Sequence, residues 1–321
     1  MEQLTPLWAW LLTDGHAGNL RQAQALAHAL HAAASTPPLL PARPWRWLAP
    51  RRLPGAERAF GPGFAQMLAQ PLPPSLAIGC GRQGALATRM LRERGVAAVQ
   101  ILDPRVDPRH WDLVIVPEHD ALRGPNVVTM HGSLHPVDAD WLAAAAVAHP
   151  HLQALPQPRV ALLVGGPTRH APWTPRRLRS QLTALRAHVQ ASGGSLLATV
   201  SRRTPASVAA AVRDAVDGIS GLAWDGQVPN PYPGLLAWAD RIVCTADSVN
   251  MLSEACATQA PVFVLDPTCA GGRLRRFLDG LLASGRVREA DAGLPYFDVQ
   301  PLRETARVAA QVRQRLGLPR A

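Results

Sequence analysis

The stretch 242-IVCTADSVNMLSEACATQAPVFVLDP-267 contains two short apolar runs joined by a polar turn and a helical segment. The apolar runs at its two ends are rich in Val, Ile and Leu, which is typical of strands buried in a parallel sheet. In the turn T-A-D-S, Asp247 or Ser248 is placed to cap the helix expected near 248–258. Strand, turn, helix and strand in this order predict an α/β fold with a parallel sheet.

The same alternation continues along the chain. In the first half, strands are predicted at 7–13, 75–79, 97–102, 112–117 and 126–130, with helices near 18–34, 82–94 and 138–148. In the second half, strands are predicted at 159–166, 195–201, 221–226, 241–246 and 261–266, with helices near 174–192, 205–217, 233–239, 248–258 and 272–284. The proline-rich segment 36–55 lacks periodicity, so we expect a strand and an irregular connection there.

This pattern predicts two Rossmann-like domains. Prolines and polar residues at 149–159 separate the two halves, so we expect one domain at 1–150 and another at 158–300. The helical pattern at 301–321 is expected to pack back on the body of the protein. Two such domains, with parallel sheets facing across a cleft, offer the usual place for a ligand.

The composition suits a globular protein and permits an anionic partner, although a coding bias toward arginine is the simplest explanation of the positive charge. The chain has 321 residues, 47% of them hydrophobic, and a formal net charge of +10, with arginine as the basic residue throughout because the sequence contains no lysine. Four cysteines form no C-x-x-C pair, and no apolar run reaches the length of a membrane span. We therefore expect a cytoplasmic protein without a metal, with peripheral contact to an anionic inner membrane left open.

The stretch 75-SLAIGCGRQGALATRML-91 carries a G-x-G-x-x-G turn formed by Gly79, Gly81 and Gly84. A strand, this turn, a helix and the later Asp103 resemble a dinucleotide-binding fingerprint. The turn does not follow the first strand, where such domains usually carry it, and glycines also serve wherever a ligand approaches the backbone closely. An NAD enzyme remains an alternative, but the Tyr-x-x-x-Lys pair common in such enzymes is impossible without lysine.

Two other predicted strand ends in the first half carry titratable side chains. Asp14 and His16 follow the first strand, and His16 is a candidate general base because imidazole is the side chain most often used for proton transfer at neutral pH. The sequence 116-VPEHDAL-122 adds His119 and Asp120. Hydrogen bonding within a capped loop would explain either group equally well. The D-x-D at 138–140 precedes a helix, so an N-cap is favoured over a metal site.

In the second half, the predicted strand ends favour binding of a diphosphate. Gly165, Gly166 and Thr168 follow one strand, where backbone N–H groups could cradle phosphates. Ser201, Arg202 and Arg203 follow the next strand, although two solvated arginines are an alternative.

The turn at 245–248 leaves the N–H groups of Val249 and Asn250 for an anion. Glu254 lies further along that helix among small residues, and it could accept hydrogen bonds from ribose hydroxyls. An exposed helix residue is the plainer interpretation of Glu254.

The segment Trp224–Pro261 resembles the donor-nucleotide region of GT-B glycosyltransferases. The resemblance implies that Trp224–Val228 lie near the base, Ser248–Asn250 at the phosphates and Glu254 at the ribose. It also implies that Gly165 and Gly166 form the turn that opens the nucleotide domain. MurG-like members carry a glycine-rich turn in their acceptor domain, and the resemblance places Gly79–Gly84 in that role.

Five motifs extend the resemblance over nearly the whole chain: D-G-x-A-G-x-x-x-Q (14–22), I-G-x-G-R (78–82), V-P-x-H-D (116–120), S-R-R-T-P (201–205) and T-x-D-S-V-x-M-x-S-E-A (245–255). Together they are similar to the mitochondrial fission "elongated mitochondria" family, whose bacterial members resemble lipopolysaccharide outer-core glycosyltransferases. The resemblance implies transfer of a sugar from a nucleoside-diphosphate sugar to a glycan or lipid-linked acceptor of the cell envelope.

On this hypothesis the enzyme is inverting and metal-independent, with no tightly bound cofactor and no nucleic-acid partner. The base is His16 assisted by Asp14, with His119 in reserve. The donor site contains Gly165, Gly166, Thr168, Ser201, Arg202, Arg203, Trp224, Asp247, Ser248, Val249, Asn250 and Glu254; the acceptor side contains Gly79, Gly81, Arg82, Gly84 and Asp120. A nucleotide-sugar epimerase and a non-catalytic adaptor, like the eukaryotic relatives that recruit a dynamin-like partner, are the alternatives.

Overall fold

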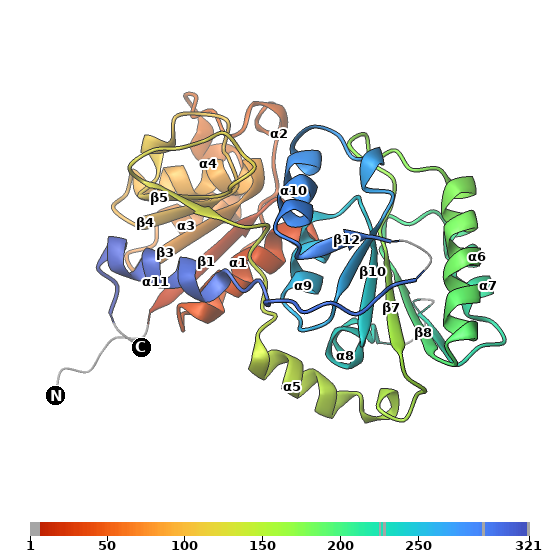
Figure 1. The fold of residues 1–321 in the computed structure, drawn as a ribbon. Helices are drawn as coiled ribbons and strands as arrows, with labels where there is room; N and C mark the ends of the chain where they lie inside the picture. The colour runs from red at the N-terminus through yellow and green to blue at the C-terminus, as the bar shows by residue number, and fades with distance from the viewer. Residues whose placement is uncertain (1–6, 225, 227–228, 291–292, 320–321) are drawn as a thin grey trace. The chain divides into compact units, whose positions relative to one another are not determined.

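The computed structural model describes residues 7–224, 226, 229–290 and 293–319. The chain forms two compact units (Figure 1). Unit 1 comprises Met1–Pro136 and Glu304–Ala321, and unit 2 comprises Val137–Arg303. Within the described residues, no helix is both long and apolar enough to span a membrane.

Unit 1 is built on a six-stranded parallel sheet in the order β2-β1-β3-β4-β5-β6. Its strands are β1 (Trp8–Thr13), β2 (Ala33–Ser35), β3 (Leu76–Cys80), β4 (Ala97–Ile101), β5 (Leu113–Pro117) and β6 (Val127–Met130). Its helices are α1 (Ala17–Ala29), α2 (Trp45–Leu48), α3 (Gly61–Leu68), α4 (Gly81–Arg92) and α11 (Thr305–Leu316). Successive side chains of β1 point to opposite faces of the sheet, so the core of unit 1 has one part on each face. Leu11 packs with α1 and α11 on one face, and Trp10 and Leu12 pack with α3 and α4 on the other.

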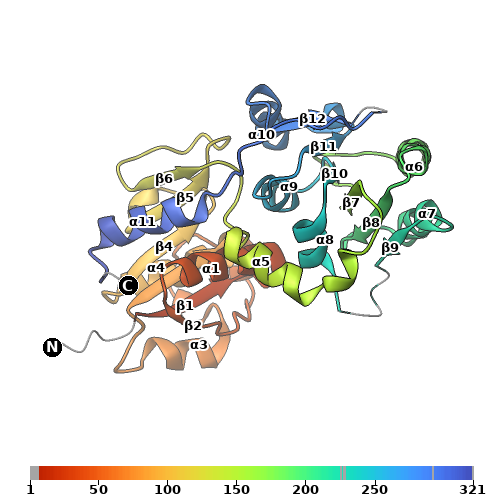
Figure 2. The same ribbon diagram turned by 60° about the horizontal axis from the view of Figure 1, so that its bottom comes forward.

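Unit 2 repeats this design, with a parallel sheet in the order β12-β11-β10-β7-β8-β9. Its strands are β7 (Arg159–Val164), β8 (Ser195–Val200), β9 (Gly221–Ala223), β10 (Arg241–Thr245), β11 (Val262–Leu265) and β12 (Val287–Glu289). Its helices are α5 (Ala139–Ala148), α6 (Pro175–Ala191), α7 (Ala206–Val216), α8 (Tyr232–Trp238), α9 (Val249–Cys256) and α10 (Gly272–Ala283). Helices α6 and α7 lie beside one another next to β8 (Figure 2).

Each sheet has one point where the strand order reverses. In unit 1 it falls between β1 and β3, and in unit 2 between β7 and β10. At such a point the loops leaving the two strands turn to opposite faces, which opens a crevice at the carboxyl edge of the sheet. The residues that follow these four strands are therefore placed by topology to meet a ligand.

The predicted strands are confirmed, but two short edge strands were missed. Strands β2 and β12 have three residues each, too few to show an alternating pattern. The helix predicted near 18–34 ends at Ala29, because His31 takes a left-handed backbone conformation (φ 51°) before β2 begins. The proline-rich segment contains the short helix α2 in place of the expected strand.

The division between the units differs from the one expected at 149–159. It falls at Pro136, because α5 packs against α8 and so belongs to unit 2. The last helix, α11, packs on α1 and β6 of unit 1. Its attachment begins at Glu304, whose carboxylate accepts the backbone N–H of His131 at 3.0 Å and pairs with Arg307. Burial acts to raise the pKa of Glu304, but these hydrogen bonds outweigh it and hold the pKa below its usual value.

The glycines of the G-x-G-x-x-G turn serve close packing inside unit 1. A Cβ atom on Gly84 would overlap the carbonyl oxygen of Leu12, so the glycine lets α4 lie directly against β1. Gly81 has a φ of +80° and leaves space for the side chains of Asp14 and Asn19. Gly79 likewise leaves space for Gln100 and Thr88. Packing thus explains the glycine spacing without a dinucleotide.

We expect Gly84→Ala to lower the free energy of unfolding of the full chain by about 3 kcal/mol, since α4 must move away from β1. Gly63→Ala is the matched control in α3, where an added Cβ would meet nothing within 4 Å. That change should stabilise the protein by up to about 1 kcal/mol through helix propensity. Urea unfolding followed by circular dichroism measures both. Equal effects of the two substitutions would contradict the packing role.

Candidate functional site

Most of the predicted donor-site residues lie at one edge of the unit 2 sheet. Gly165 follows β7, Ser201 follows β8, Trp224 follows β9 and Asp247 lies just beyond β10. Because all strands are parallel, these loops leave the sheet at its carboxyl edge, and the reversal between β7 and β10 lies among them. The topology thus brings together segments that are far apart in sequence, as in the hydrogen bond between Gly165 and Thr245, which are 80 residues apart.

The carboxylate of Asp247 connects these loops. Its Oδ1 accepts hydrogen bonds from the Thr245 hydroxyl (2.6 Å) and the Trp173 indole N–H (3.1 Å). Its Oδ2 accepts the backbone N–H of Gly166 (3.0 Å) and lies 3.3 Å from the guanidinium of Arg203. The Asp247 side chain has no exposed surface, so four donors, one of them the cation Arg203, satisfy a charge that burial alone would make costly.

Gly165 and Gly166 have a packing role in this network. A Cβ on Gly165 would collide with the Asp247 carboxylate, and one on Gly166 would collide with the backbone of Arg203. Their N–H groups, which the sequence assigned to a diphosphate, donate to Thr245 Oγ1 (2.8 Å) and Asp247. The paired glycines therefore shape the site, while their amides are used inside the protein.

The S-R-R-T turn after β8 fixes the two arginines differently. The Ser201 hydroxyl accepts the backbone N–H of Arg203 and lies 3.1 Å from the Thr204 hydroxyl, so it holds the turn. Thr204 in turn donates to the carbonyl of Gly165 at 2.6 Å. Arg203 is anchored by Asp247, yet its side chain is 54% exposed. Arg202 is exposed and forms no ion pair within the described part of the chain.

The N-terminus of α9 borders the same turn. Ser248 is the N-cap, and its hydroxyl accepts the backbone N–H of Met251 at 3.3 Å. Val249 and Asn250 occupy the first helical positions, whose N–H groups have no intrahelical partner. Both residues are partly exposed. Helix geometry thus presents two backbone donors beside Arg203.

Glu254 is buried, so its interpretation as an exposed helix residue is wrong. Its carboxylate accepts a hydrogen bond from the hydroxyl of Tyr232 in α8 at 2.5 Å. Trp224 is partly buried just after β9, where its backbone N–H donates to Ala198. Of the predicted base-contacting segment, Asp225, Gln227 and Val228 lie outside the described residues.

The structure adds a second anchored arginine that the sequence did not single out. Arg177, in the first turn of α6, reaches Asp266 at 2.8 Å, and Asp266 is buried just beyond β11. Burial, followed by the charges of Asp266 and Asp247, raises the pKa of Cys269 to about 11. An arginine at a helix N-terminus is unfavourable next to the positive end of the helix dipole. The pair 176-RR-177 just after the Thr174 cap is therefore the sequence feature that could have pointed to Arg177.

Thr168 belongs to a tight hairpin in the loop between β7 and α6. Thr168 and Ala171 exchange backbone hydrogen bonds of 3.1 Å, which leaves Arg169 and His170 at the exposed tip. The carbonyl of His170 accepts the N–H of Gly271, at the start of α10, at 2.7 Å. The Thr168 hydroxyl accepts the N–H groups of His170 and Ala171, so its role is to hold the hairpin.

In unit 1, Asp14 and His16 lie at the carboxyl end of β1, beside the glycine turn. Asp14 Oδ1 accepts the side-chain N–H of Asn19 (2.8 Å) and the backbone N–H of His16 (3.3 Å). The expected contact between Asp14 and the imidazole is therefore replaced by one to the backbone. His16 is exposed at the N-cap of α1, and its ring forms no hydrogen bond within the described residues.

His119 and Asp120 follow β5, and β3 and β4 lie between that strand and β1. Three strand spacings of about 4.8 Å put the ends of β1 and β5 roughly 14 Å apart, so His16 and His119 lie on separate loops along the same edge of the sheet. Asp120 is buried in the turn, and Glu118 pairs with His131 at 3.1 Å. Arg82, one residue after Gly81, is exposed. Asp138 caps α5 by accepting the Trp141 N–H at 2.8 Å, which confirms the predicted N-cap.

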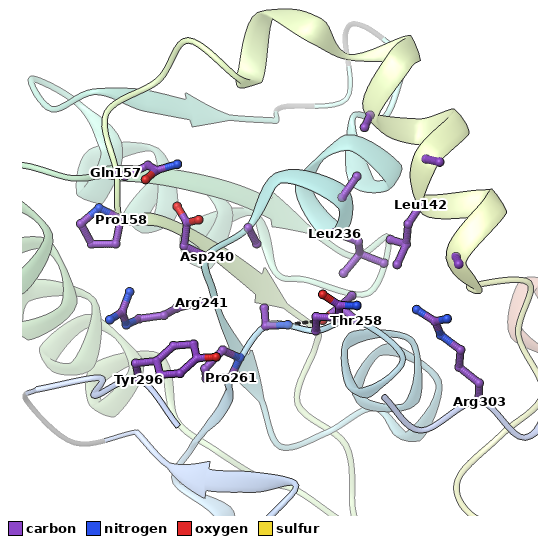
Figure 3. A pocket seen from close by; sticks show the side chains of 17 residues that line it. Leu142, Gln157, Pro158, Leu236, Asp240, Arg241, Thr258, Pro261, Tyr296 and Arg303 are labelled. Atoms are coloured by element: carbon purple, nitrogen blue, oxygen red, sulfur yellow. Dashed lines mark hydrogen bonds between the residues drawn. The ribbon is translucent and has the colours of Figure 1, made fainter. Parts of the chain in front are cut away.

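A cavity of about 860 Å³ lies at the opposite, amino edge of the unit 2 sheet (Figure 3). Its wall includes Pro158, Arg241 and Pro261, next to the beginnings of β7, β10 and β11, together with Leu142 of α5. Within the described residues, it shares no lining residue with the carboxyl-edge loops. The anchored arginines and this cavity are therefore separate features of unit 2.

Residues 17–316 match the family model described as Mitochondrial fission ELM1. The chain belongs to this family. The mitochondrial fission protein ELM1 of Arabidopsis thaliana is 34% identical over 275 residues, which cover 76% of this chain and 64% of that protein. The chain thus spans less than two thirds of the plant relative. A protein of Rickettsia prowazekii, RP120, is 25% identical over 346 residues, covering 94% of this chain and 96% of that protein.

Solved structures with the same fold cover nearly the whole chain. MurG of Acinetobacter baumannii matches with a TM-score of 0.50 and 14% identity, covering 98% of this chain and 92% of that one. The UDP-GlcNAc 2-epimerase of Neisseria meningitidis, bound to UDP-GlcNAc, matches with a TM-score of 0.55 and 11% identity, covering 97% and 100%. These likenesses and the two parallel sheets confirm the predicted GT-B fold of this family member.

We expect Asp247→Asn to lower the free energy of unfolding by about 3 kcal/mol, because a buried amide cannot accept all four hydrogen bonds or pair with Arg203. The control is Asp279→Asn, which breaks the exposed pair of Asp279 with Arg275. That change should cost about 0.5 kcal/mol or less. Urea unfolding of the full chain measures the difference, and a cost for Asp247→Asn no greater than that of the control would contradict the role of Asp247.

Proposed function

We propose that this chain is a glycosyltransferase that takes a sugar from a nucleoside-diphosphate sugar bound to unit 2. The observation that carries the proposal is the arrangement at the carboxyl edge of the unit 2 sheet. There the N-terminus of α9 lies beside Arg203, and Arg177 is anchored close by. Backbone N–H groups and guanidinium groups are the donors that bind phosphate oxygens most effectively.

The two anchored arginines suit a diphosphate because each is fixed without being covered. Buried carboxylates hold one edge of each guanidinium, while the side chains of Arg203 and Arg177 stay 54% and 60% exposed. A planar guanidinium has five N–H donors, so a carboxylate contact leaves others for a phosphate. Holding these groups in place before the ligand arrives lowers the entropy lost on binding. The same cations would stabilise the charge that develops on a departing diphosphate.

The remaining donor contacts follow the sequence resemblance. Trp224 is proposed to face the base, and Glu254 is proposed to bind the ribose. Glu254 lies in α9, and its carboxylate accepts the hydrogen bond of the Tyr232 hydroxyl. The proposal includes no tightly bound cofactor and no metal. Two solved structures with this fold, an epimerase bound to UDP-GlcNAc and an S. aureus MnaA–UDP complex, support a nucleotide-sugar partner.

We expect Arg203→Gln to raise the dissociation constant for UDP about tenfold, equivalent to about 1.4 kcal/mol, by removing a charged phosphate donor. The affinity for uridine, which has no phosphate, should change less than twofold. Arg213→Gln, an exposed arginine on α7, is the matched control. Isothermal titration calorimetry measures all three proteins. An equal loss of uridine and UDP affinity would contradict phosphate binding by Arg203.

His16 is the proposed general base that activates an acceptor hydroxyl of a glycan or lipid-linked glycan, with His119 in reserve. Its exposed ring at the carboxyl edge of the unit 1 sheet supports this role. The acceptor is proposed to bind on unit 1 near Gly79–Gly84, Arg82 and Asp120. Because Asp14 contacts the His16 backbone, we assign Asp14 to positioning the loop.

We expect His16→Ala to keep the UDP dissociation constant within twofold and to lower turnover of the nucleotide sugar at least a hundredfold, as loss of a general base does. His28→Ala, an exposed histidine further along α1, is the matched control and should turn over normally. Release of UDP is measured in the presence of acceptor extract. Loss of turnover in His119→Ala with full turnover in His16→Ala would reassign the base.

Epimerisation of a nucleotide sugar is the second candidate, because UDP-GlcNAc 2-epimerases match this fold with TM-scores of 0.55 and 0.54. Both reactions require the same donor site, and the need for an acceptor distinguishes them. Incubation with UDP-GlcNAc alone would give its C2 epimer if the chain is an epimerase, and no such product if it is a transferase. Absence of any nucleotide binding would favour a non-catalytic adaptor.

A further inference from the structure

Residues 40–58 of unit 1, here called the arginine–tryptophan segment, combine exposed apolar side chains with excess positive charge. The segment contains five arginines and a single glutamate. Seven large hydrophobic side chains are exposed among the described residues, and three of them, Leu40, Trp47 and Leu53, lie here. Leu40 is 70% exposed and Trp47 is 58% exposed. Exposed apolar side chains among positive charges indicate an interaction site for a partner that is both anionic and partly apolar.

The exposed tryptophan is held in place by its neighbours. Trp45 and Trp47 lie two positions apart in α2, about 200° around the helix axis, so they point to different sides. Trp45 is buried in the core with Phe60 and Phe64. The guanidinium of Arg43 lies 5.3 Å from the ring of Trp47. Trp47 therefore points outward from a helix that the buried side chain of Trp45 holds in place.

The charges of the segment are largely unneutralised. Arg52 pairs with Glu93 at 3.1 Å. Arg46, Arg51 and Arg58 are exposed, and they form no ion pair with any acidic residue that the structure describes. Free guanidinium groups around an outward tryptophan suit the headgroup region of a membrane, where arginine meets lipid phosphates and tryptophan sits at the boundary of the acyl chains.

We propose that the arginine–tryptophan segment docks unit 1 on the surface of an anionic lipid bilayer. The occupant is a membrane because the segment is strongly basic and carries exposed Trp47 and Leu40. An anionic bilayer offers negative headgroups directly above an apolar layer, which matches both features. Trp47 and Leu40 enter the interface, and the arginines bind anionic headgroups. Docking of this kind requires no membrane-spanning helix.

The segment also adjoins the predicted acceptor side of unit 1. The side-chain N–H of Gln83, in the first turn of α4, donates to the carbonyl of Arg46 at 3.2 Å. The segment therefore packs directly against the start of α4, where the glycine turn lies. On the proposed transferase function, this places the acceptor subsite next to lipid, where a lipid-linked acceptor resides. The docking itself does not depend on that function.

Vesicle co-sedimentation of the full chain tests the proposal. We expect binding to vesicles of phosphatidylcholine mixed with phosphatidylglycerol, weaker binding at high salt, and none to phosphatidylcholine alone. The double substitutions Leu40→Ser with Trp47→Ser, and Arg46→Gln with Arg51→Gln, should each lower the bound fraction at least fivefold. All four side chains are exposed, so melting temperatures should stay near that of the unsubstituted protein.

Val147→Ser with Arg179→Gln is the matched control, since it removes an exposed apolar group and an exposed arginine from unit 2. It should bind vesicles like the unsubstituted chain. Failure of the unsubstituted chain to bind anionic vesicles would overturn the proposal and leave the segment to a protein partner. Equal loss in the control and segment variants would also overturn it, because binding would then reflect net charge alone. UDP affinity, measured in parallel, reports on the proposed function separately.

Discussion

The buried carboxylate of Asp247 is the constraint on which the unit 2 site depends. It accepts hydrogen bonds from Gly166 and Trp173, which follow β7, and from Thr245 at the end of β10. It also holds Arg203 from the loop after β8. A carboxylate buried in this way is tolerated only when nearly all of its acceptor positions are used. The backbone of Gly165 then lies so close to the Asp247 carboxylate, and that of Gly166 so close to the Arg203 backbone, that neither position has room for a Cβ atom.

Unit 1 uses a related solution at its own strand reversal. Asp14 follows β1, accepts hydrogen bonds from Asn19 and the His16 backbone, and lies against Gly81 of the neighbouring turn. In both units an aspartate packs against a glycine at the carboxyl edge of the sheet. The difference lies in charge, since Asp247 and Asp266 each hold a half-exposed arginine at the edge of unit 2. An anionic ligand is therefore better suited to unit 2.

The sequence predicted the fold well because parallel strands buried on both faces give unbroken apolar runs, as in 160-VALLV-164. No comparable pattern marks the three-residue edge strand β2 or the four-residue helix α2 of the proline-rich segment. The sequence also predicted which loops lie together at the carboxyl edge of unit 2, since each of them follows a strand. It could not show that the amides of Gly165 and Gly166 are used internally, or that Arg177 meets Asp266, because both depend on contacts between distant segments. Burial of Glu254 likewise depends on Tyr232 in another helix.

The central claim is that the carboxyl edge of unit 2 binds the two phosphates of a nucleotide sugar. A crystal structure of the chain with UDP-GlcNAc tests it most directly. The account predicts the diphosphate at the N–H groups of Val249 and Asn250, with Arg203 and Arg177 in contact with its oxygens. A nucleotide held at the Gly79–Gly84 turn of unit 1, or in the cavity at the amino edge of unit 2, would contradict it.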